Sequence, residues 1–383
     1  MIRSLVYYSS GLWPCGVASY HRQLVTQLST HVPVASVPLP SRRVFARDRA
    51  GLNALRAEYD TLADQARSHT LALIDYTDSF WNGSRVGEGQ FPRFLRRLSV
   101  PTCLVIHEGP GRTDPAETVG PYWQRGVQRL SDWLRAVRDD GALNHSEYVT
   151  KHQFRRAARI VTHSPTVLQL PGVQACNDRV TLLPMPTYAL PTGEGAYDSD
   201  PRRIVFLLGF AQHSKGFDLA IEALPQLPAG IRMIHVGSST GSESAREQLR
   251  QQAIKLGVAD RIEFAPRLSD DDLGKLLKQA WLGLAPFRHV EHSSSLGHMI
   301  AAGMPIVASD IVTTRQLLQD GAGMVLLPRL DAPAIVETIH ALDQDPTRIE
   351  ELRRQNQVFA ERNNFRTVAE QLVRILGEIC HDG

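Results

Sequence analysis

Two polar residues follow apolar runs in places where their side chains could take part in chemistry. His107 follows the run 102–106 and enters a loop rich in glycine and proline. Lys215 lies in a polar loop after the run 203–208, just before a helical pattern. An imidazole can exchange hydrogen bonds with hydroxyl groups, and an ammonium can neutralise a leaving diphosphate. Each could also be an ordinary structural or solvated side chain, so neither residue alone names a reaction.

A third candidate is the long polar loop 286–296, which leads into a helical stretch of small and apolar residues. It contains Glu291 and the three consecutive serines 293–295. Hydroxyl groups and free N–H groups at the start of a helix suit a phosphate or another oxyanion. A serine N-cap without a ligand would explain the serines equally well. Gly16, in the N-terminal loop, would let the backbone approach a phosphate closely, with simple turn chemistry as the alternative.

These segments together resemble the GT4 group of GT-B glycosyltransferases. Residues 297–309, GHMIAAGMPIVAS, are similar to that group's diphosphate-binding helix and strand, usually seen as EAMACGLPVVAS. Residues 209–217 are similar to its G-R-x-x-x-x-K-G loop, and residues 248–268 to its lgl-drV-f-G segment. Gly16 matches the group's N-terminal glycine loop, and His107 matches a histidine common at a strand end in these enzymes.

The resemblance implies a glycosyltransferase whose UDP- or GDP-sugar donor is held mainly by the second half of the chain. It implies transfer with retention of the anomeric configuration, without a metal and without a cofactor apart from the nucleotide-sugar substrate. A catalytic role is implied for His107, Lys215 and Glu291. Donor binding is implied for a larger set: Gly16, Phe210, Gly237, Arg267, Leu268, Ser293, Ser294, Ser295, Leu296 and His298.

The sequence departs from the group's pattern at two places. Phe210 stands where the group has an arginine. When its paired-glutamate motif is aligned on Gly303, Val290 and His298 occupy the two glutamate positions, and Glu291 lies one position late. These departures leave open a catalytically silent GT-B partner or regulatory subunit. A sugar phosphorylase or an epimerase on the same architecture is a third possibility, because a fold does not fix a function.

Hydrophobic patterning predicts the strands and helices that position these loops. Short apolar runs alternate with amphipathic stretches such as 17–28, which predicts βαβ units around parallel sheets. The predicted strands are 5–8, 71–74, 102–106, 159–162 and 181–183 in the first half, and 203–208, 232–236, 261–264, 283–285 and 305–308 in the second.

The stretch 190–201 is rich in glycine, proline and aspartate and predicts a domain boundary. Apolar residues at helical spacing predict a closing helix over 365–379. We therefore expect an α/β chain of the GT-B class, with two Rossmann-like domains facing a central cleft. Residues 1–190, closed by the helix 365–383, would form the acceptor side, and residues 201–364 would bind the nucleotide sugar.

Charge is distributed unevenly along the 383 residues. The first 190 contain 22 Lys and Arg against 15 Asp and Glu, a net charge of +7, whereas the remainder has a net charge of −5. The segment 91–98 mixes apolar and arginine positions as a short helix would, and 154–159 is a second such stretch. Basic amphipathic segments can lie on an anionic membrane. They would suit a lipid-linked acceptor, whereas arginines paired with local carboxylates would suit a soluble glycan or small-molecule acceptor.

Several classes of protein are excluded by what the sequence lacks. Its four cysteines are far apart and form no zinc-ligand or disulfide pattern, which favours a reducing cytoplasm. No apolar run approaches the roughly 18 residues needed to span a bilayer, and no cleavable signal pattern is present, so any membrane contact is expected to be peripheral on the inner face.

The acidic run 270–272 is expected to be a helix start capped by Ser269 and not a metal site. Nothing points to nucleic acid.

Overall fold

The computed structural model describes residues 2–10, 16–40, 49–77, 81, 90–108, 154–190, 203–237, 243–290 and 293–380. The chain divides into two compact units, residues 1–183 with 368–383 (unit 1) and residues 184–367 (unit 2). The sequence places the boundary at 190–201, whereas residues 184–190 belong to unit 2. Contacts within unit 2 explain this difference, because Thr187 pairs with Asn364 and the Tyr188 ring stacks on His298.

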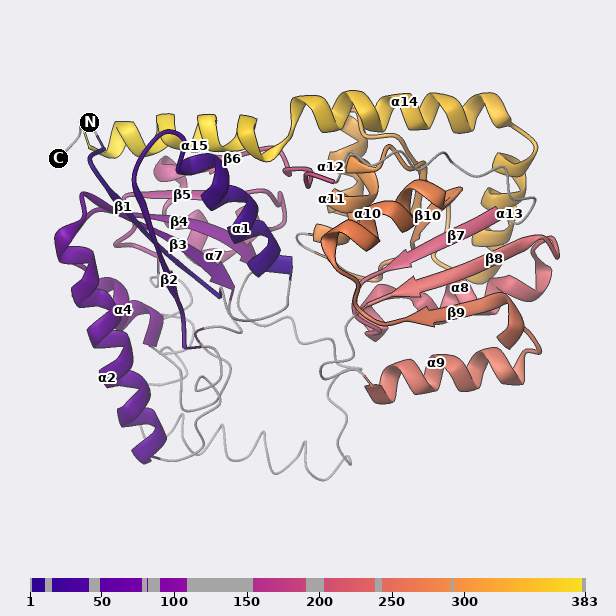
Figure 1. Ribbon diagram of the computed structural model, residues 1–383, viewed down its shortest axis with the longest axis horizontal. Coiled ribbons are helices and arrows are strands. Elements are labelled where there is room, and N and C mark those ends of the chain that lie inside the picture. Colours follow the sequence, from indigo (N-terminus) through magenta and orange to yellow (C-terminus); the bar gives the residue numbers. More distant parts are fainter. Residues whose placement is uncertain are drawn as a thin grey trace. The chain divides into compact units, whose positions relative to one another are not determined.

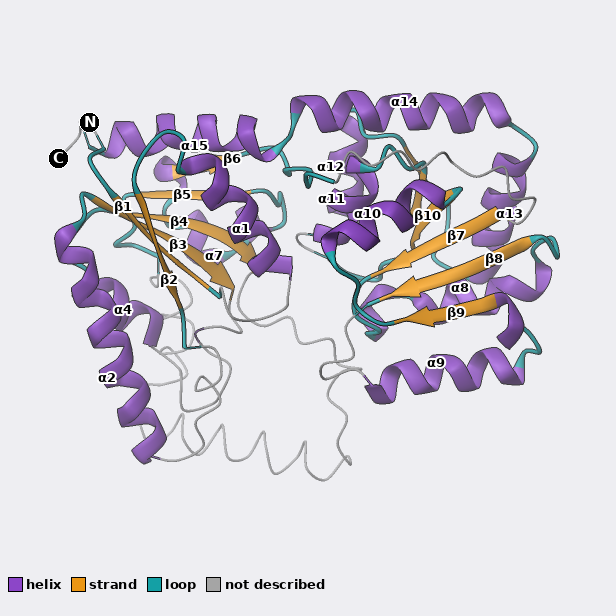
Figure 2. Cartoon of the chain, in the orientation of Figure 1, coloured by secondary structure: helices purple, strands orange, loops and turns teal. Residues whose placement is uncertain are grey.

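Unit 1 contains a six-stranded sheet in which every described pair is parallel, in the order β2-β1-β3-β4-β5-β6. Its central strands are buried on both faces, which is why they read as continuous apolar runs. Figure 2 shows the strands as neighbouring arrows. The strands are β1 (Leu5–Ser9), β2 (Val34–Pro38), β3 (Leu71–Thr77), β4 (Thr102–Glu108), β5 (Arg159–Thr162) and β6 (Val180–Leu182).

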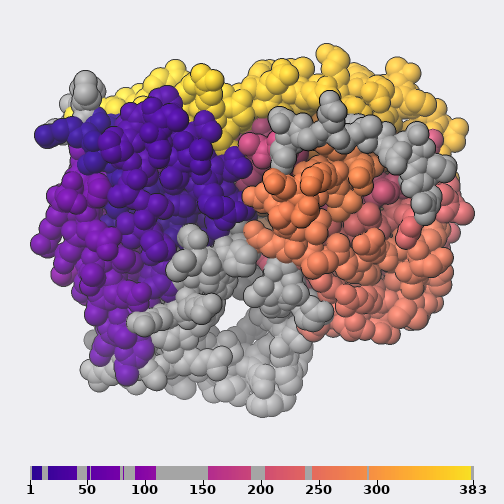
Figure 3. All heavy atoms as spheres, in the orientation of Figure 1, coloured from indigo at the N-terminus to yellow at the C-terminus, as the bar shows by residue number. Residues whose placement is uncertain are grey.

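Helices of unit 1 include the predicted C-terminal helix, which is confirmed as α15 (Phe365–Ile379). From residue 368 on, α15 groups with unit 1 and buries Leu372 and Leu376. In Figure 1 it runs beside the N-terminal strands, and in Figure 3 its yellow atoms adjoin the indigo N-terminal ones. The other described helices are α1 (Gly16–Leu28), α2 (Arg49–Gln65), α4 (Gln90–Arg97) and the short α7 (Pro171–Gln174).

Unit 2 contains a second parallel six-stranded sheet, in the order β12-β11-β10-β7-β8-β9. The chain builds the sheet outward from β7 to β9 and then returns to β7 to build the other side from β10. The strands are β7 (Arg203–Leu208), β8 (Ile231–Val236), β9 (Ile262–Ala265), β10 (Leu282–Ala285), β11 (Ile306–Ala308) and β12 (Met324–Leu326). The helices are α8 (Phe217–Ala223), α9 (Glu243–Lys255), α10 (Asp270–Gln279), α11 (Ser294–Ala301), α12 (Val312–Gln319), α13 (Ala332–Asp343) and α14 (Pro346–Arg362).

Two Rossmann-like halves are thus confirmed, but three details of the sequence prediction are wrong. The strands β2 and β12 were not predicted; both lie at an edge of their sheet, and β12 has only three residues. Residues 154–159 are not a second amphipathic helix, because a turn at 154–156 leads into β5. Within the described ranges, no helix combines the length and the apolar character that a membrane crossing requires.

Candidate functional site

The strand order of unit 2 identifies one place in its sheet where a ligand would bind. Open parallel sheets bind ligands beyond the carboxyl ends of strands, where the strand order reverses. In unit 2 this switch point lies between β7 and β10, which are neighbours in the sheet. The loop after β7 begins at Gly209, and the loop after β10 begins at Pro286. Both loops carry residues that the sequence singles out.

Lys215 and Ser295 both lie close to Gly209, the residue that follows β7. Its φ of +129° is in a region that side chains other than glycine rarely adopt. A Cβ added to Gly209 would lie 3.1 Å from Ser295 Oγ and 3.7 Å from Lys215 Cε. The structure therefore brings the ammonium-bearing side chain of Lys215 and the Ser295 hydroxyl together beside a glycine at the end of β7.

Lys215 is half-buried and held by its neighbours. It ends a single helical turn, and Gly216 follows it with a φ of +65°. Its Nζ lies 4.2 Å from the centroid of the Phe287 ring, which comes from the loop after β10. A cation over an aromatic face is attracted by the ring, so this contact draws the ammonium toward the β10 side of the switch point.

The serines at the start of α11 divide into a structural cap and candidate ligands. The Ser293 hydroxyl accepts a hydrogen bond from the Leu296 N–H at 3.3 Å, so Ser293 is an N-cap. The first-turn N–H groups of Ser294 and Ser295 have no partner within the helix. Together with the positive end of the helix dipole they suit an anion. The cap therefore accounts for Ser293 and Leu296, whereas Ser294 and Ser295 keep the features of an anion site.

Arg288, which the sequence analysis missed, joins the two loops. Its guanidinium makes two hydrogen bonds of 2.7 Å to the carboxylate of Asp218 and a third of 2.7 Å to the His213 carbonyl. Burial raises the pKa of Asp218, but the hydrogen bond and charge of Arg288 outweigh it, so that pKa lies below its usual value. Phe210 is half-buried in the loop after β7, at the position of the arginine in the G-R-x-x-x-x-K-G loop that this segment resembles.

Gly237 and His235 support Gly209 from the neighbouring strand β8. A Cβ at Gly237 would lie only 2.0 Å from the Gly209 oxygen, so a side chain there would displace the loop. His235 Nε2 donates to the same oxygen at 2.9 Å. Burial, reinforced by the charges of Arg246 and Arg250, lowers the pKa of His235 to about 4 against the opposing effect of this hydrogen bond.

The His235 pKa predicts that acid weakens unit 2. The unfolded chain binds this proton near the ordinary pKa of 6.5, whereas the folded chain resists it down to about 4. Protonation between these values therefore favours unfolding, and His235 should lower the free energy of unfolding by about 2 kcal/mol between pH 7 and pH 5. Urea titrations at the two pH values would measure the loss. In His235→Gln, whose amide can still donate to Gly209, this loss should disappear; an unchanged pH dependence would contradict the assignment.

Three further sequence candidates lie around α10 and α11. His298 Nδ1 donates to the Ser294 carbonyl at 2.6 Å, its ring stacks 3.9 Å from that of Tyr188, and burial lowers its pKa. Arg267 is exposed and Leu268 packs on the core, both after β9. These contacts give His298 a clear structural role within α11.

The acidic run 270–272 starts α10 as predicted. The Ser269 hydroxyl accepts from the Asp272 N–H at 3.1 Å, which confirms the cap. Among the residues with a described position, no group of three His, Cys, Asp or Glu side chains could hold a metal ion. Glu291 lies outside the described residues.

In unit 1, His107 lies within β4 and is buried. Its Nε2 is 2.9 Å from Asp75 Oδ1 on the neighbouring strand β3. Asp75, buried in β3, is a second residue that the sequence analysis missed. It could have been found from the sequence, because it is a charged residue within the apolar run 71–76. Gly16 is the first residue of α1 in the same unit.

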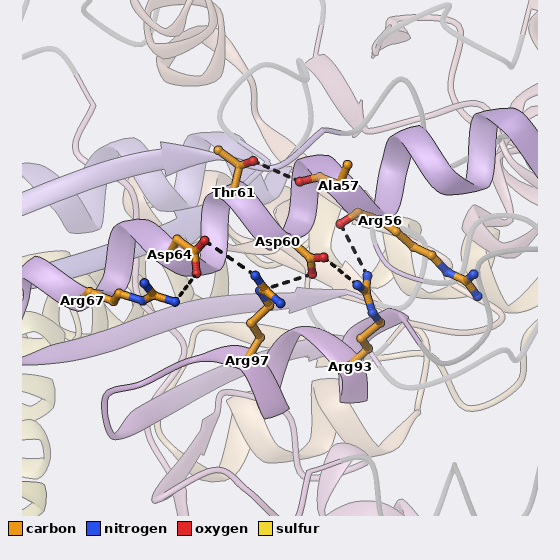
Figure 4. Close-up of polar contacts among 8 residues, drawn as sticks. All are labelled: Arg56, Ala57, Asp60, Thr61, Asp64, Arg67, Arg93 and Arg97. Carbon is orange, nitrogen blue, oxygen red and sulfur yellow. Dashed lines mark hydrogen bonds and ion pairs between the residues drawn. The ribbon is translucent and has the colours of Figure 1, made fainter.

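The arginines of α4 are engaged by carboxylates of α2 (Figure 4). Arg93 donates to Asp60 at 2.6 Å. Arg97 lies 3.5 Å from Asp60 and 3.7 Å from Asp64. Local pairing, one of the two alternatives for this basic segment, is therefore present for two of its three arginines.

Comparisons with known proteins agree with this description. Residues 201–345 match the family model described as Glycosyl transferases group 1. A D-inositol 3-phosphate glycosyltransferase from Acidothermus cellulolyticus is 32% identical over 136 residues, or 32% of this chain and 30% of that protein. In eight curated relatives the alignments span between 30% and 56% of the relatives' length.

Solved structures match over the whole chain. The sucrose-phosphate synthase of Thermosynechococcus elongatus has a TM-score of 0.72 at 16% identity and covers 100% of both chains. Anabaena HepE, solved in complex with UDP and glucose, has a TM-score of 0.65 at 15% identity and covers 98% of this chain and 100% of its own. Both sheets and their connections thus form the GT-B fold, and residues 201–345 of the chain match the group 1 glycosyltransferases.

Proposed function

We propose that the protein is a glycosyltransferase that moves a sugar from a nucleotide-sugar donor to an acceptor. The observation that carries this proposal is the convergence of Lys215, Ser295 and the start of α11 on Gly209 at the switch point of unit 2. A diphosphate bound there would meet a cation, a hydroxyl and helix N–H groups at once. Each of these favours negative charge, and that charge grows on the diphosphate as its bond to the sugar breaks.

The proposal extends to the GT4 group, to retention and to a reaction without a metal or a further cofactor. Lys215 and the α11 start would supply the positive potential that a metal supplies in other transferases. UDP-sugars are the first donors to test, because the similar HepE was solved with UDP; GDP-sugars come next. Within this proposal Lys215 and Ser295 contact the diphosphate, Arg267 and Leu268 lie toward the base, and His107 contacts the donor sugar.

The acceptor is proposed to be a glycan, a lipid-linked sugar or a small molecule that meets the enzyme in the cytoplasm. Pairing of Arg93 and Arg97 with Asp60 and Asp64 leaves less positive charge on α4 for an anionic membrane. These ion pairs favour an acceptor in solution. Peripheral attachment to the inner face of a membrane stays a prediction.

A donor panel tests the proposal directly. Binding of the correct donor stabilises the folded state, by about 2.7 kcal/mol when its concentration is 100 times its Kd. UDP-glucose, GDP-mannose and the free nucleotides should be compared by thermal shift, followed by release of UDP or GDP with and without EDTA. Turnover of one nucleotide sugar is expected, and its loss in EDTA would overturn the metal-free proposal. Binding without turnover would favour the silent-partner alternative, and a requirement for inorganic phosphate would favour a phosphorylase.

A further inference from the structure

A carboxylate in the interior of unit 1 holds the side chain of His107. Asp75 on β3 is completely buried, and an ionised carboxylate is costly there unless it is paired. Its Oδ1 accepts from Tyr7 Oη at 2.9 Å and lies 2.9 Å from His107 Nε2. Its Oδ2 lies 3.6 Å from His21 Nδ1. Burial alone would raise the pKa of Asp75, but the two histidines outweigh it and hold that pKa well below its usual range.

We propose that Asp75 is a positioning residue for His107, which it holds with a proton on Nε2 and the lone pair on Nδ1. An ionised carboxylate can only accept hydrogen bonds, so the 2.9 Å contact requires the imidazole nitrogen to donate. A neutral imidazole carries one proton, and Nδ1 is then the acceptor. The tautomer follows from the contact between Asp75 and His107. Only its consequence for the recognition of the sugar rests on the proposed function.

A second set of contacts packs against the ring of His107. The Tyr20 ring meets that of His107 edge-on, with the centroids 4.6 Å apart. Tyr20 Oη lies 2.8 Å from His163 Nε2, and His163 Nδ1 is 3.3 Å from the Leu183 carbonyl. Because a carbonyl only accepts, Nδ1 of His163 donates, and Tyr20 donates to Nε2. Tyr20 is therefore oriented by a directed hydrogen-bond chain, and His107 is held at one nitrogen and packed against the Tyr20 ring.

This arrangement determines what His107 can recognise. With its lone pair on Nδ1, neutral His107 accepts a hydrogen bond and cannot donate one from that atom. Its partner in the proposed reaction is accordingly a donating hydroxyl group of the donor sugar, and not a carbonyl or a phosphate oxygen. Without the fixed proton, the ring would sample the wrong tautomer, which is how loss of a carboxylate disables a histidine in enzymes with a catalytic triad.

Histidine-selective ¹⁵N NMR of the full chain tests the tautomer without any ligand. The His107 signal is assigned by its disappearance in His107→Gln. At about pH 8, where ordinary imidazoles are neutral, we expect the pattern of a ring protonated on Nε2 alone. In Asp75→Asn, whose amide can both donate and accept, that single form should give way to a mixture. A ring protonated on Nδ1 in the wild-type chain, alone or together with Nε2, overturns the proposal even where Asp75→Asn does not fold.

Activity supplies the second readout. With the donor found in the panel, Asp75→Asn should lower kcat/KM by about 10-fold to 100-fold, the usual effect of losing such an outer hydrogen-bond partner. Tyr8→Phe is the control, because it removes a partly buried hydrogen bond from β1 to the Leu62 carbonyl, and that bond does not involve Asp75. It should leave both the NMR pattern and kcat/KM unchanged. An Asp75→Asn enzyme with the wild-type tautomer and kcat/KM also overturns the proposal. An inactive wild-type chain that shows the Nε2 form contradicts the proposed function instead.

Discussion

Replacing Lys215 with alanine is expected to lower turnover of the donor by about 100-fold or more. Charge grows on the diphosphate as the bond to the sugar breaks, so a cation held in advance stabilises the transition state more than the bound donor. The structure fixes this cation between Gly209 and the Phe287 ring, where it is half-buried and less screened than a surface lysine. Steady-state release of the nucleotide at saturating donor is the measurement.

Two further variants separate the charge from other effects of the substitution. Lys215→Met keeps an unbranched apolar side chain beside Phe287 and removes only the ammonium, so its turnover should fall nearly as far. Lys275→Ala removes an exposed lysine of α10 whose ammonium lies 3.8 Å from Asp272. It makes the same change in net charge within unit 2 and should keep wild-type turnover. If Lys215→Ala turned over saturating donor at the wild-type rate, Lys215 would have no part in the mechanism.

The sequence predicts the elements of this fold well where burial is complete. Strands such as β4 and β7, enclosed on both faces, show as uninterrupted apolar runs, and α15 shows its buried side at helical spacing. The strands β2 and β12 are not predicted, although the other two edge strands, β6 and β9, are, so edge position alone does not explain the difference. In β2 only Val37 is buried, so its residues need not all be apolar.

The candidate site is less predictable, because its contacts join residues that are distant in the chain. A motif locates Lys215, but nothing in its local sequence indicates that Phe287 lies beneath it or that Arg288 pairs with Asp218, 70 residues away. Asp75 differs, since a carboxylate inside the apolar run LALIDYT needs a buried partner. That requirement can be inferred from the sequence, whereas its fulfilment by His107 and Tyr7 depends on the strand order.

Gly216→Ala is expected to have the largest effect on stability, because two costs act at one position. Gly216 has a φ of +65°, and placing a residue with a Cβ in this region costs roughly 1–2 kcal/mol. That Cβ would also lie 1.9 Å from the Pro286 carbonyl oxygen, which belongs to backbone and cannot swing away. Overpacking of this kind adds roughly 1–3 kcal/mol. We therefore expect the free energy of unfolding of unit 2 to fall by about 3 kcal/mol in urea titrations.

Comparison with Gly257→Ala isolates the cost of the close contact between the new Cβ and the Pro286 carbonyl. Gly257 lies in the same unit with a φ of +70°, nearly that of Gly216, but a Cβ there would meet nothing within 4 Å. It should lose only the roughly 1–2 kcal/mol of the backbone conformation. Equal losses in the two variants would mean that the approach of Gly216 to Pro286 is not tight in solution. A larger loss of stability in Gly216→Ala would mean that its Cβ displaces the Pro286 carbonyl. Pro286 is the residue before Phe287, so this displacement would also affect the candidate site. The displacement would reach the ring beneath the Lys215 ammonium, and donor turnover should then fall in Gly216→Ala but not in Gly257→Ala.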